Sequence, residues 1–196
     1  LENFFSIYLK KINNPKILDF GSQSLSDHIG AKVLLNKINI KYEYTGVDIE
    51  KGNNVDIVLE DPYSFKEIPD AAYDVIISTS VLEHVEFFWL TYLEILRILK
   101  PNGVFYFNVP SNGDFHRWPQ DCWRFYPDSG NALINWAKRN NFNPILLESF
   151  VSNQYLECGW NDYVSVTLKD EKYLNTFNDR IIHRHKKFLN GVDHNK

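Results

Sequence analysis

Short apolar runs alternate with amphipathic segments along most of the chain. The apolar runs, each long enough for one buried strand, lie at 16–20, 42–48, 55–59, 73–78 and 104–109. Apolar residues at helical spacing predict helices over 2–12, 26–38, 86–99 and 129–140. Strands that alternate with helices are typical of a parallel sheet with helices on both faces. The pattern therefore predicts a doubly wound α/β fold.

The C-terminal part of the chain breaks this alternation. Two further apolar runs, 144–150 and 163–169, have no full helix between them, so we expect an antiparallel last strand inserted beside its predecessor. The sheet would then have seven strands and be mostly parallel. From residue 170 the chain is polar and charged, and we expect a tail that is partly helical around 171–189. The predicted organisation is one domain, 1–196, with a leading helix at 1–13, a core at 14–170 and a charged tail at 171–196.

Acidic residues follow three successive predicted strands. Asp19, Asp48 and Asp61 each come at the end of one of these runs. Because the carboxyl ends of parallel strands meet at one edge of a sheet, we expect the three acids to line one crevice. An acid at the tip of the second strand can accept hydrogen bonds from both hydroxyls of a ribose, which is the role expected of Asp48. Asp61 would accept from the exocyclic amine of adenine. The alternative is that strand-end acids cap helices and turns.

The turn after the first strand reads Gly21-Ser22-Gln23-Ser24-Leu25 and contains a single glycine. A dinucleotide needs a close approach of the backbone to its pyrophosphate, which glycine-rich loops provide. The lack of further glycines therefore argues against NAD or FAD as the ligand.

Composition narrows the class of protein further. The net charge of -4 argues against a broad nucleic-acid-binding or anionic-membrane surface. Cys122 and Cys158 are the only cysteines, so neither a disulfide framework nor a thiolate zinc cluster is expected, and no other pattern indicates a metal site. We find no apolar run of the roughly 20 residues that a spanning helix needs, and no secretory signal. These features favour a cytoplasmic protein.

Five segments together carry a resemblance to a known family: ILDFGS, GVDIE, VLEDPY, YDVIISTSVLEHV and LRILKPNGVFYFNVPS. Over residues 14–170 the chain resembles the class I S-adenosylmethionine-dependent methyltransferases, and in particular type 11-like members. The resemblance implies a Rossmann-like fold, S-adenosyl-L-methionine as cofactor and S-adenosyl-L-homocysteine as product. The residues that it places at the cofactor are Asp19, Gly21, Ser22, Gln23, Asp48, Ile49, Asp61, Pro62 and Ser80. The family usually has Gly-x-Gly-x-Gly in the first loop, of which only Gly21 is present here.

The segment from Asn108 to Gly130 is long, irregular and rich in aromatic residues. A loop of this length inside a compact domain is usually functional. Arginine can bind a carboxylate or phosphate with two hydrogen bonds, and aromatic rings can stack on a sugar or base. The residues predicted to bind the methyl acceptor are Arg117, Trp118, Trp123, Arg124 and Tyr126. The alternative is an aromatic cluster in which arginine–aspartate pairs hold the loop down.

This segment resembles the HRxPxDxWRF stretch of methyltransferases associated with surface-polysaccharide (capsule or lipopolysaccharide) and other glycan biosynthesis. That resemblance implies a small acceptor such as a sugar, a nucleotide sugar or a phosphorylated metabolite.

Transfer of a methyl group from a sulfonium is an in-line displacement, in which positioning is the main contribution to catalysis. A hydroxyl acceptor also benefits from a general base, most often histidine. His116 in the loop is our first candidate for this base, followed by His84, with Glu83 and Asp121 as further candidates. We therefore expect an O-methyltransferase that acts as a monomer or homodimer. The alternatives are N-methylation of an amino sugar and a binding module that has kept the fold without activity.

Overall fold

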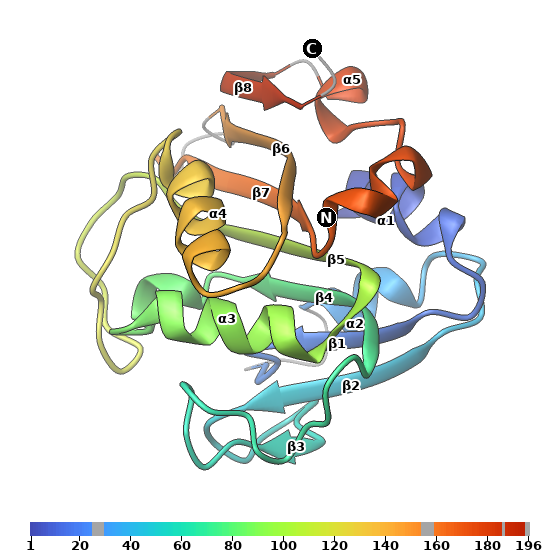
Figure 1. Cartoon of the computed structure of the whole chain (residues 1–196). Coiled ribbons are helices and arrows are strands. Elements are labelled where there is room, and N and C mark those ends of the chain that lie inside the picture. The colour runs from blue at the N-terminus through green and yellow to red at the C-terminus, as the bar shows by residue number, and fades with distance from the viewer. Residues whose placement is uncertain (25–29, 154–158, 186, 195–196) are drawn as a thin grey trace.

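The protein forms a mixed β-sheet with helices packed against it (Figure 1). The computed structural model describes residues 1–24, 30–153, 159–185 and 187–194. The sheet has eight strands in the order β3-β2-β1-β4-β5-β7-β6-β8. The neighbours from β3 to β5 pair in parallel. The bounds of these five strands are Lys16–Phe20 (β1), Glu43–Asp48 (β2), Ile57–Val58 (β3), Tyr73–Thr79 (β4) and Leu99–Pro110 (β5).

The rest of the sheet is antiparallel. Strand β7 (Asp162–Leu168) lies between β5 and β6 (Ile145–Ser152) and runs antiparallel to both, as predicted for an inserted last strand. The expected total of seven strands is wrong, because β8 (Phe188–Asp193) adds an eighth strand beside β6. This strand is an edge strand whose central residues are exposed, so it carries none of the apolar signal that reveals a buried strand.

Helices cover both faces of the sheet, and the alternation of side chains along the strands divides the core between them. Ile76, Phe105 and Phe107 face one layer, which contains α3 (Phe88–Ile98) and α4 (Ser129–Arg139). Val75, Val104 and Tyr106 face the other layer. That second layer contains α1 (Glu2–Ile7), the 3₁₀ turn η1 (Leu9–Lys11), α2 (Ala31–Leu35), the 3₁₀ turn η4 (Glu171–Thr176) and α5 (Ile181–Arg184). Successive strand residues point to opposite faces, so one strand contributes to both layers.

Three predicted helices differ from the observed ones. The helix expected over 2–12 ends at Ile7 and is followed by the 3₁₀ turn η1. The helix expected over 26–38 is present only as α2, which ends at Leu35, and positions 25–29 lie outside the described residues. The tail around 171–189 is not one helix but η4, the four-residue α5 and then β8. The helices expected over 86–99 and 129–140 are present as α3 and α4.

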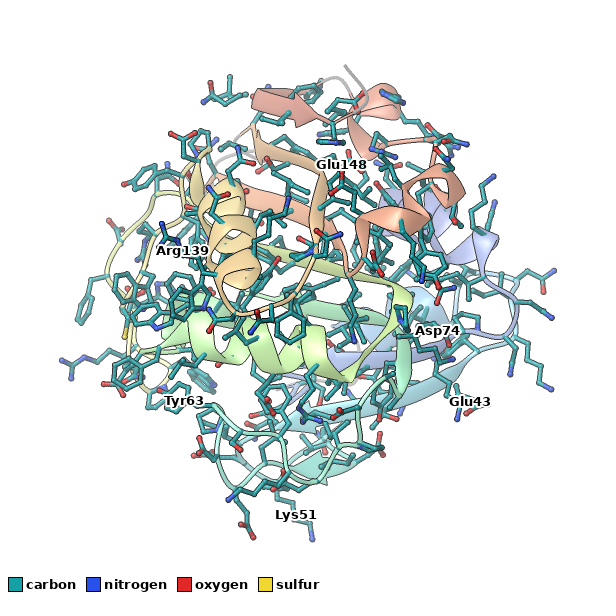
Figure 2. All side chains as sticks on the ribbon, in the orientation of Figure 1. Glu43, Lys51, Tyr63, Asp74, Arg139 and Glu148 are labelled. Atoms are coloured by element: carbon teal, nitrogen blue, oxygen red, sulfur yellow. The ribbon has the colours of Figure 1, made fainter. Side chains whose placement is uncertain are left out.

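The tail is attached to the sheet through a buried carboxylate on β6. Glu148, labelled in Figure 2, accepts a hydrogen bond from the hydroxyl of Tyr8 at 2.5 Å and from the backbone N–H groups of Ile181 and Ile182 at 2.8 and 3.0 Å. Arg180 beside it is fully buried and donates to the carbonyl of Leu147 at 2.9 Å. Since a buried carboxylate is costly without such donors, α1 and α5 are held to the same face of the sheet.

Candidate active site

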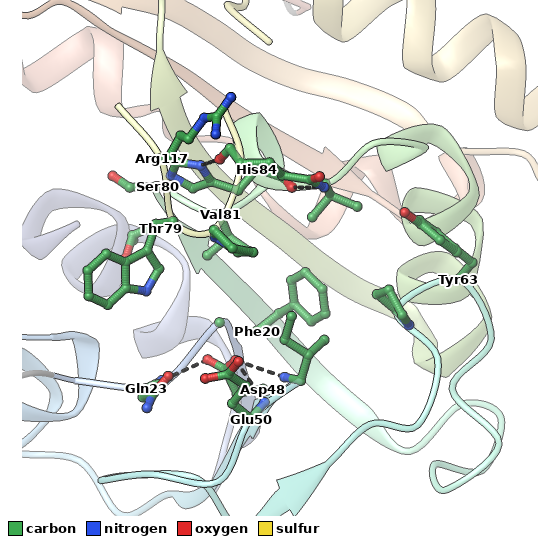
Figure 3. A pocket seen from close by; sticks show the side chains of 17 residues that line it. Phe20, Gln23, Asp48, Glu50, Tyr63, Thr79, Ser80, Val81, His84 and Arg117 are labelled. Atoms are coloured by element: carbon green, nitrogen blue, oxygen red, sulfur yellow. Dashed lines mark hydrogen bonds between the residues drawn. The ribbon is translucent and has the colours of Figure 1, made fainter. Parts of the chain in front are cut away.

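A cavity of about 490 Å³ lies at the carboxyl ends of β1, β2 and β4, in the size range of small-molecule sites. One wall is formed by these strand ends and the other by residues 117–120 of the long loop. Figure 3 shows Asp48 and Glu50 at one end of it and His84 and Arg117 at the other, with Thr79, Ser80 and Val81 between them. The predicted site residues that line it are Gly21, Gln23, Asp48, Ile49, Pro62, Ser80, His84, Arg117 and Trp118.

Asp48 is held at the tip of β2 by backbone donors. Its Oδ2 atom accepts from the N–H of Gln23 at 3.0 Å, and its Oδ1 atom accepts from the N–H groups of Ile49 and Glu50 at 2.8 and 3.4 Å. Two carboxylate oxygens offer about four lone-pair sites. The side chain is therefore fixed in place and can still accept a hydrogen bond from a ligand in the cavity.

Gly21 allows the first loop to approach β4 closely. Its φ angle is +79°, and a Cβ atom built on it would lie 2.1 Å from Cγ2 of Val81. Its N–H donates to the carbonyl of Val47 at 2.8 Å, which keeps the loop against β2. Any side chain at this position would meet both a strained backbone and a steric clash. This double constraint accounts for the one glycine in an otherwise glycine-free loop.

Three predicted cofactor residues lie outside the cavity wall among the described residues. Asp19 is 5% exposed and accepts from the hydroxyl of Tyr44 at 2.8 Å, and burial raises the pKa of Asp19 to about 6. Ser22 donates through Oγ to the carbonyl of Asn54 at 3.0 Å. Asp61 accepts from the N–H of Tyr63 at 2.8 Å. The contacts of these three residues shape the loops that carry Gly21, Pro62 and Tyr63.

The long loop folds back onto the segment that follows β4. The N–H groups of Cys122 and Trp123 donate to the carbonyl of Glu83 at 2.8 and 3.1 Å, and the indole N–H of Trp123 donates to the carbonyl of Val85 at 3.1 Å. The side chain of Gln120 donates to the carbonyl of His84 at 2.8 Å. These bonds place residues 117–120 across the cavity from Asp48.

An ion pair stiffens the loop from inside. Arg124 binds both oxygens of Asp121, at 2.5 and 2.8 Å, and also donates to the carbonyl of Asp114 at 2.9 Å. The neighbouring guanidinium of Arg124 lowers the pKa of Asp121 and the carboxylate raises the pKa of Arg124. Asp121 also accepts from the N–H of His116 at 2.9 Å. Among the described residues, neither Asp121 nor Arg124 reaches the cavity wall, and this part of the loop fits the alternative of an arginine–aspartate pair that holds it down.

The aromatic residues of the loop differ in what their rings contact. Phe125 is buried and its ring lies 4.9 Å from that of Phe88, whereas Tyr126 is 61% exposed on the outer surface. Trp123 packs on α3, with its ring 5.5 Å from that of Phe88. Trp118 lines the cavity. Of the three aromatic residues predicted to bind the acceptor, only Trp118 is placed to do so in this conformation.

Glu83, His84 and His116 meet beside the cavity. The Nδ1 atom of His84 donates to the carbonyl of Gln120, and its Nε2 atom lies 3.7 Å from Oε1 of Glu83. The ring of His116 is nearly perpendicular to that of His84, with 5.0 Å between the centroids. Burial raises the pKa of Glu83 to about 7 and lowers the pKa of His84. His84 is thus kept neutral and lines the cavity, and His116 packs against its ring.

Comparison with known proteins identifies the family and the fold. A sequence model described as a methyltransferase domain matches residues 3–147. The chain belongs to this methyltransferase-domain family. No curated protein sequence matches the chain. None of the helices in the described part of this methyltransferase domain is long and apolar enough to cross a membrane.

Solved structures of methyltransferases share the fold. The 1,6-didemethyltoxoflavin-N1-methyltransferase of Burkholderia thailandensis, solved with 1,6-didemethyltoxoflavin and S-adenosylhomocysteine, is 16% identical with a TM-score of 0.60, and the match covers 86% of this chain and 77% of that one. A SAM-dependent methyltransferase of Methanosarcina mazei is 15% identical with a TM-score of 0.57, over 83% of this chain and 96% of that one. The carbon methyltransferase CurJ is 14% identical with a TM-score of 0.55, over 81% and 49%.

The cavity of this methyltransferase domain also contains residues that sequence reasoning missed. Glu50 lies two positions after Asp48, and the paired acids of GVDIE are a signal that could have indicated it. Tyr63 follows directly on Pro62 and could have been found from the same turn. Gln120 reaches the cavity only because the loop folds back on residues 82–86, and no sequence pattern indicates that contact.

Proposed function

We propose that this domain transfers a methyl group from S-adenosylmethionine to a hydroxyl of a small sugar-like or phosphorylated acceptor, such as a nucleotide sugar or another precursor of a surface polysaccharide. The observation that carries the proposal is the single cavity with a carboxylate at one end and a cation and a neutral imidazole at the other. One end suits the ribose of the cofactor and the other suits an anionic acceptor with a reactive hydroxyl.

The cofactor lies along the strand ends in this proposal. Asp48 accepts hydrogen bonds from the ribose hydroxyls, each worth about 1.5–3 kcal/mol as a bond to a charged group. Pro62 and Tyr63 flank the adenine, and the loop at Gly21 holds the methionine part. S-adenosylmethionine has no phosphate, so it does not need the glycine-rich loop that a dinucleotide requires.

The acceptor lies under the long loop. Arg117 lines the cavity, its guanidinium lies 5.3 Å from the ring centre of Phe115, and among the described residues no carboxylate pairs with it. A cation without a protein counter-ion in a cavity is suited to bind a phosphate or carboxylate of a ligand. Trp118 adds an aromatic face beside it, as sugar recognition commonly uses.

Catalysis follows from position and from proton removal. The methyl group moves from sulfur to oxygen in line, and holding the two reactants together supplies most of the rate enhancement. His84 has Nδ1 committed as a donor, so its Nε2 atom carries the lone pair that can accept the hydroxyl proton. A general base contributes typically 10²–10⁴-fold. His116, the first candidate from the sequence, packs against the ring of His84. Asp121 contributes by holding the loop in place through its ion pair with Arg124.

Calorimetric titration tests the cofactor assignment. We expect S-adenosylmethionine to bind and NAD not to bind. Asp48→Asn should lower the affinity for S-adenosylmethionine about 10–100-fold. Asp114→Asn, which removes an exposed charge, serves as the matched control and should leave the affinity unchanged. Failure of the wild-type protein to bind S-adenosylmethionine at millimolar concentration would overturn the proposal.

Release of S-adenosylhomocysteine in the presence of nucleotide sugars and phosphorylated metabolites tests the acceptor. We expect turnover with at least one anionic hydroxyl acceptor. Cofactor binding without turnover on any acceptor would support the binding-module alternative. Turnover confined to amino sugars would support N-methylation.

A further inference from the structure

Three side chains of types that can bind a metal ion come together from two segments at the end of the cavity. Glu83 and His84 belong to the 3₁₀ turn η2 (Leu82–His84), and His116 comes from the long loop. One ligand atom from each lies within 4.8 Å of the others. No metal site was expected from the sequence, because His116 joins the other two only when the loop folds back.

Glu83 is the anomalous member of the cluster. Its side chain is 1% exposed, and neither carboxylate oxygen receives a hydrogen bond from another described residue. A buried carboxylate without donors is strongly unfavourable, because the loss of water is not compensated. A bound cation would supply the missing compensation.

Both imidazoles are oriented as metal ligands commonly are. Nδ1 of His84 donates to the carbonyl of Gln120. Nδ1 of His116 lies 3.2 Å from the carbonyl of Asp114 and 3.5 Å from Oδ2 of Asp121. A ligating histidine typically gives its other ring N–H to a carbonyl or carboxylate in this way, which fixes the tautomer and leaves Nε2 as the ligand atom.

We propose that Glu83, His84 and His116 bind one divalent transition-metal ion of the zinc type. Two imidazole nitrogens and one carboxylate oxygen suit Zn²⁺ and its neighbours better than Mg²⁺ or Ca²⁺, which prefer oxygen ligands. Zinc bonds of about 2.0–2.2 Å require ligand atoms roughly 3.3 Å apart, so the side chains must close by up to about 1.5 Å. Three protein ligands leave a position open, and His84 places the ion at the cavity.

The consequence for the reaction rests on the proposed function, whereas metal binding does not. An acceptor hydroxyl on the open position becomes acidic, and its proton passes to water because both Nε2 atoms are occupied by the metal. The alkoxide oxygen then forms a bond to the methyl carbon. The bond from carbon to sulfur breaks with its electron pair on sulfur, which yields S-adenosylhomocysteine. In the metal-loaded protein the ion thus takes over the role that Nε2 of His84 has in the metal-free protein.

Titration of the chelator-treated, untagged protein with Co²⁺ tests the site by visible absorption, without cofactor or acceptor. We expect one equivalent to bind with ligand-field bands of a four- or five-coordinate ion. Glu83→Gln and His116→Gln should each weaken binding at least 10-fold. His194→Gln, which removes an exposed histidine outside the cluster, is the matched control and should bind like the wild type.

Thermal unfolding of each variant shows whether it is folded, and Glu83→Gln is the more secure variant because it removes a buried charge. Absence of Co²⁺ binding, or binding that neither variant weakens, overturns the metal site. A parallel titration with S-adenosylmethionine separates the two proposals. If the wild-type protein binds Co²⁺ but not S-adenosylmethionine, the proposed function is overturned. If it binds S-adenosylmethionine but not Co²⁺, the metal site is overturned.

Discussion

His84 and Gln120 exchange two hydrogen bonds at one end of the cavity. Nδ1 of His84 donates to the backbone carbonyl of Gln120, and the side-chain amide of Gln120 donates to the backbone carbonyl of His84 at 2.8 Å. The first bond fixes the tautomer of the imidazole and the second fixes the loop relative to η2. Because both residues line the cavity, this reciprocal pair sets the geometry of the reactive end of the site.

Replacement of His84 by asparagine should separate structure from chemistry. The asparagine amide can still donate to the carbonyl of Gln120, but no atom replaces Nε2. We expect kcat to fall about 10²–10⁴-fold, while the melting temperature and the affinity for S-adenosylmethionine stay near their wild-type values. Steady-state kinetics and calorimetry measure these quantities. Wild-type kcat in His84→Asn would remove this residue from the chemistry.

Gly21→Ala should destabilise the protein more than Gly30→Ala does. Both glycines have a positive φ angle, but only at Gly21 would the new Cβ atom clash, 2.1 Å from Val81, whereas no atom of the described residues lies within 4 Å at Gly30. The strained backbone costs roughly 1–3 kcal/mol at either position, and the clash adds about 1–3 kcal/mol at Gly21. Urea unfolding measures both. Equal destabilisation of the two variants would show that the loop can move away from β4.

Arg117→Gln should affect the acceptor and spare the cofactor. Loss of the guanidinium removes a charge-assisted contact, so KM for an anionic acceptor should rise about 10–100-fold at constant affinity for S-adenosylmethionine. Arg117→Lys keeps the charge but cannot donate two parallel hydrogen bonds, so its KM should lie between those of the wild type and Arg117→Gln. Tyr126→Phe on the exposed surface is the control. The KM for a neutral acceptor should not change in Arg117→Gln. An unchanged KM for a phosphorylated acceptor would show that Arg117 does not bind it.

Asp19 should make the free energy of unfolding fall as pH rises. Its pKa in the folded protein is about 6, above the ordinary value of 3.8, so the folded state holds the proton more tightly. The stabilising contribution is complete below about pH 4 and is lost as pH rises through about 6, with an upper limit of about 3 kcal/mol. Asp19→Asn mimics the protonated form. Relative to that variant, the wild type should lose stability between pH 4 and 7 in urea titrations without cofactor, and a pH-independent difference would contradict the assignment.

The parts of the fold that could be predicted are those in which burial imposes a pattern. The central residues of the apolar strands β1, β4 and β5 and the inner stripe of α3 are buried, so their pattern is visible in the sequence. The exposed edge strand β8 has no such pattern. For the same reason the parallel strands could be predicted from the sequence and the eighth strand could not.

The same distinction applies to the residues of the site. Gly21 and Asp48 could be placed because strand ends of parallel sheets converge on one edge. The roles of loop residues depended on contacts between distant segments, such as Trp123 with Val85 and Arg124 with Asp121. Local sequence shows which side chains are present in a loop, but whether they face the cavity is decided by tertiary hydrogen bonds.

The position of residues 117–120 has an energetic consequence for the two substrates. This segment forms a wall of the same cavity whose opposite end holds Asp48, so either substrate restricts the same piece of chain. The first substrate to bind meets the free-energy cost of adjusting this segment, and the second binds without that cost. The resulting free energy of coupling is reciprocal: any factor by which the cofactor tightens the acceptor is the factor by which the acceptor tightens the cofactor. Affinities measured for one substrate alone will therefore understate those of the ternary complex.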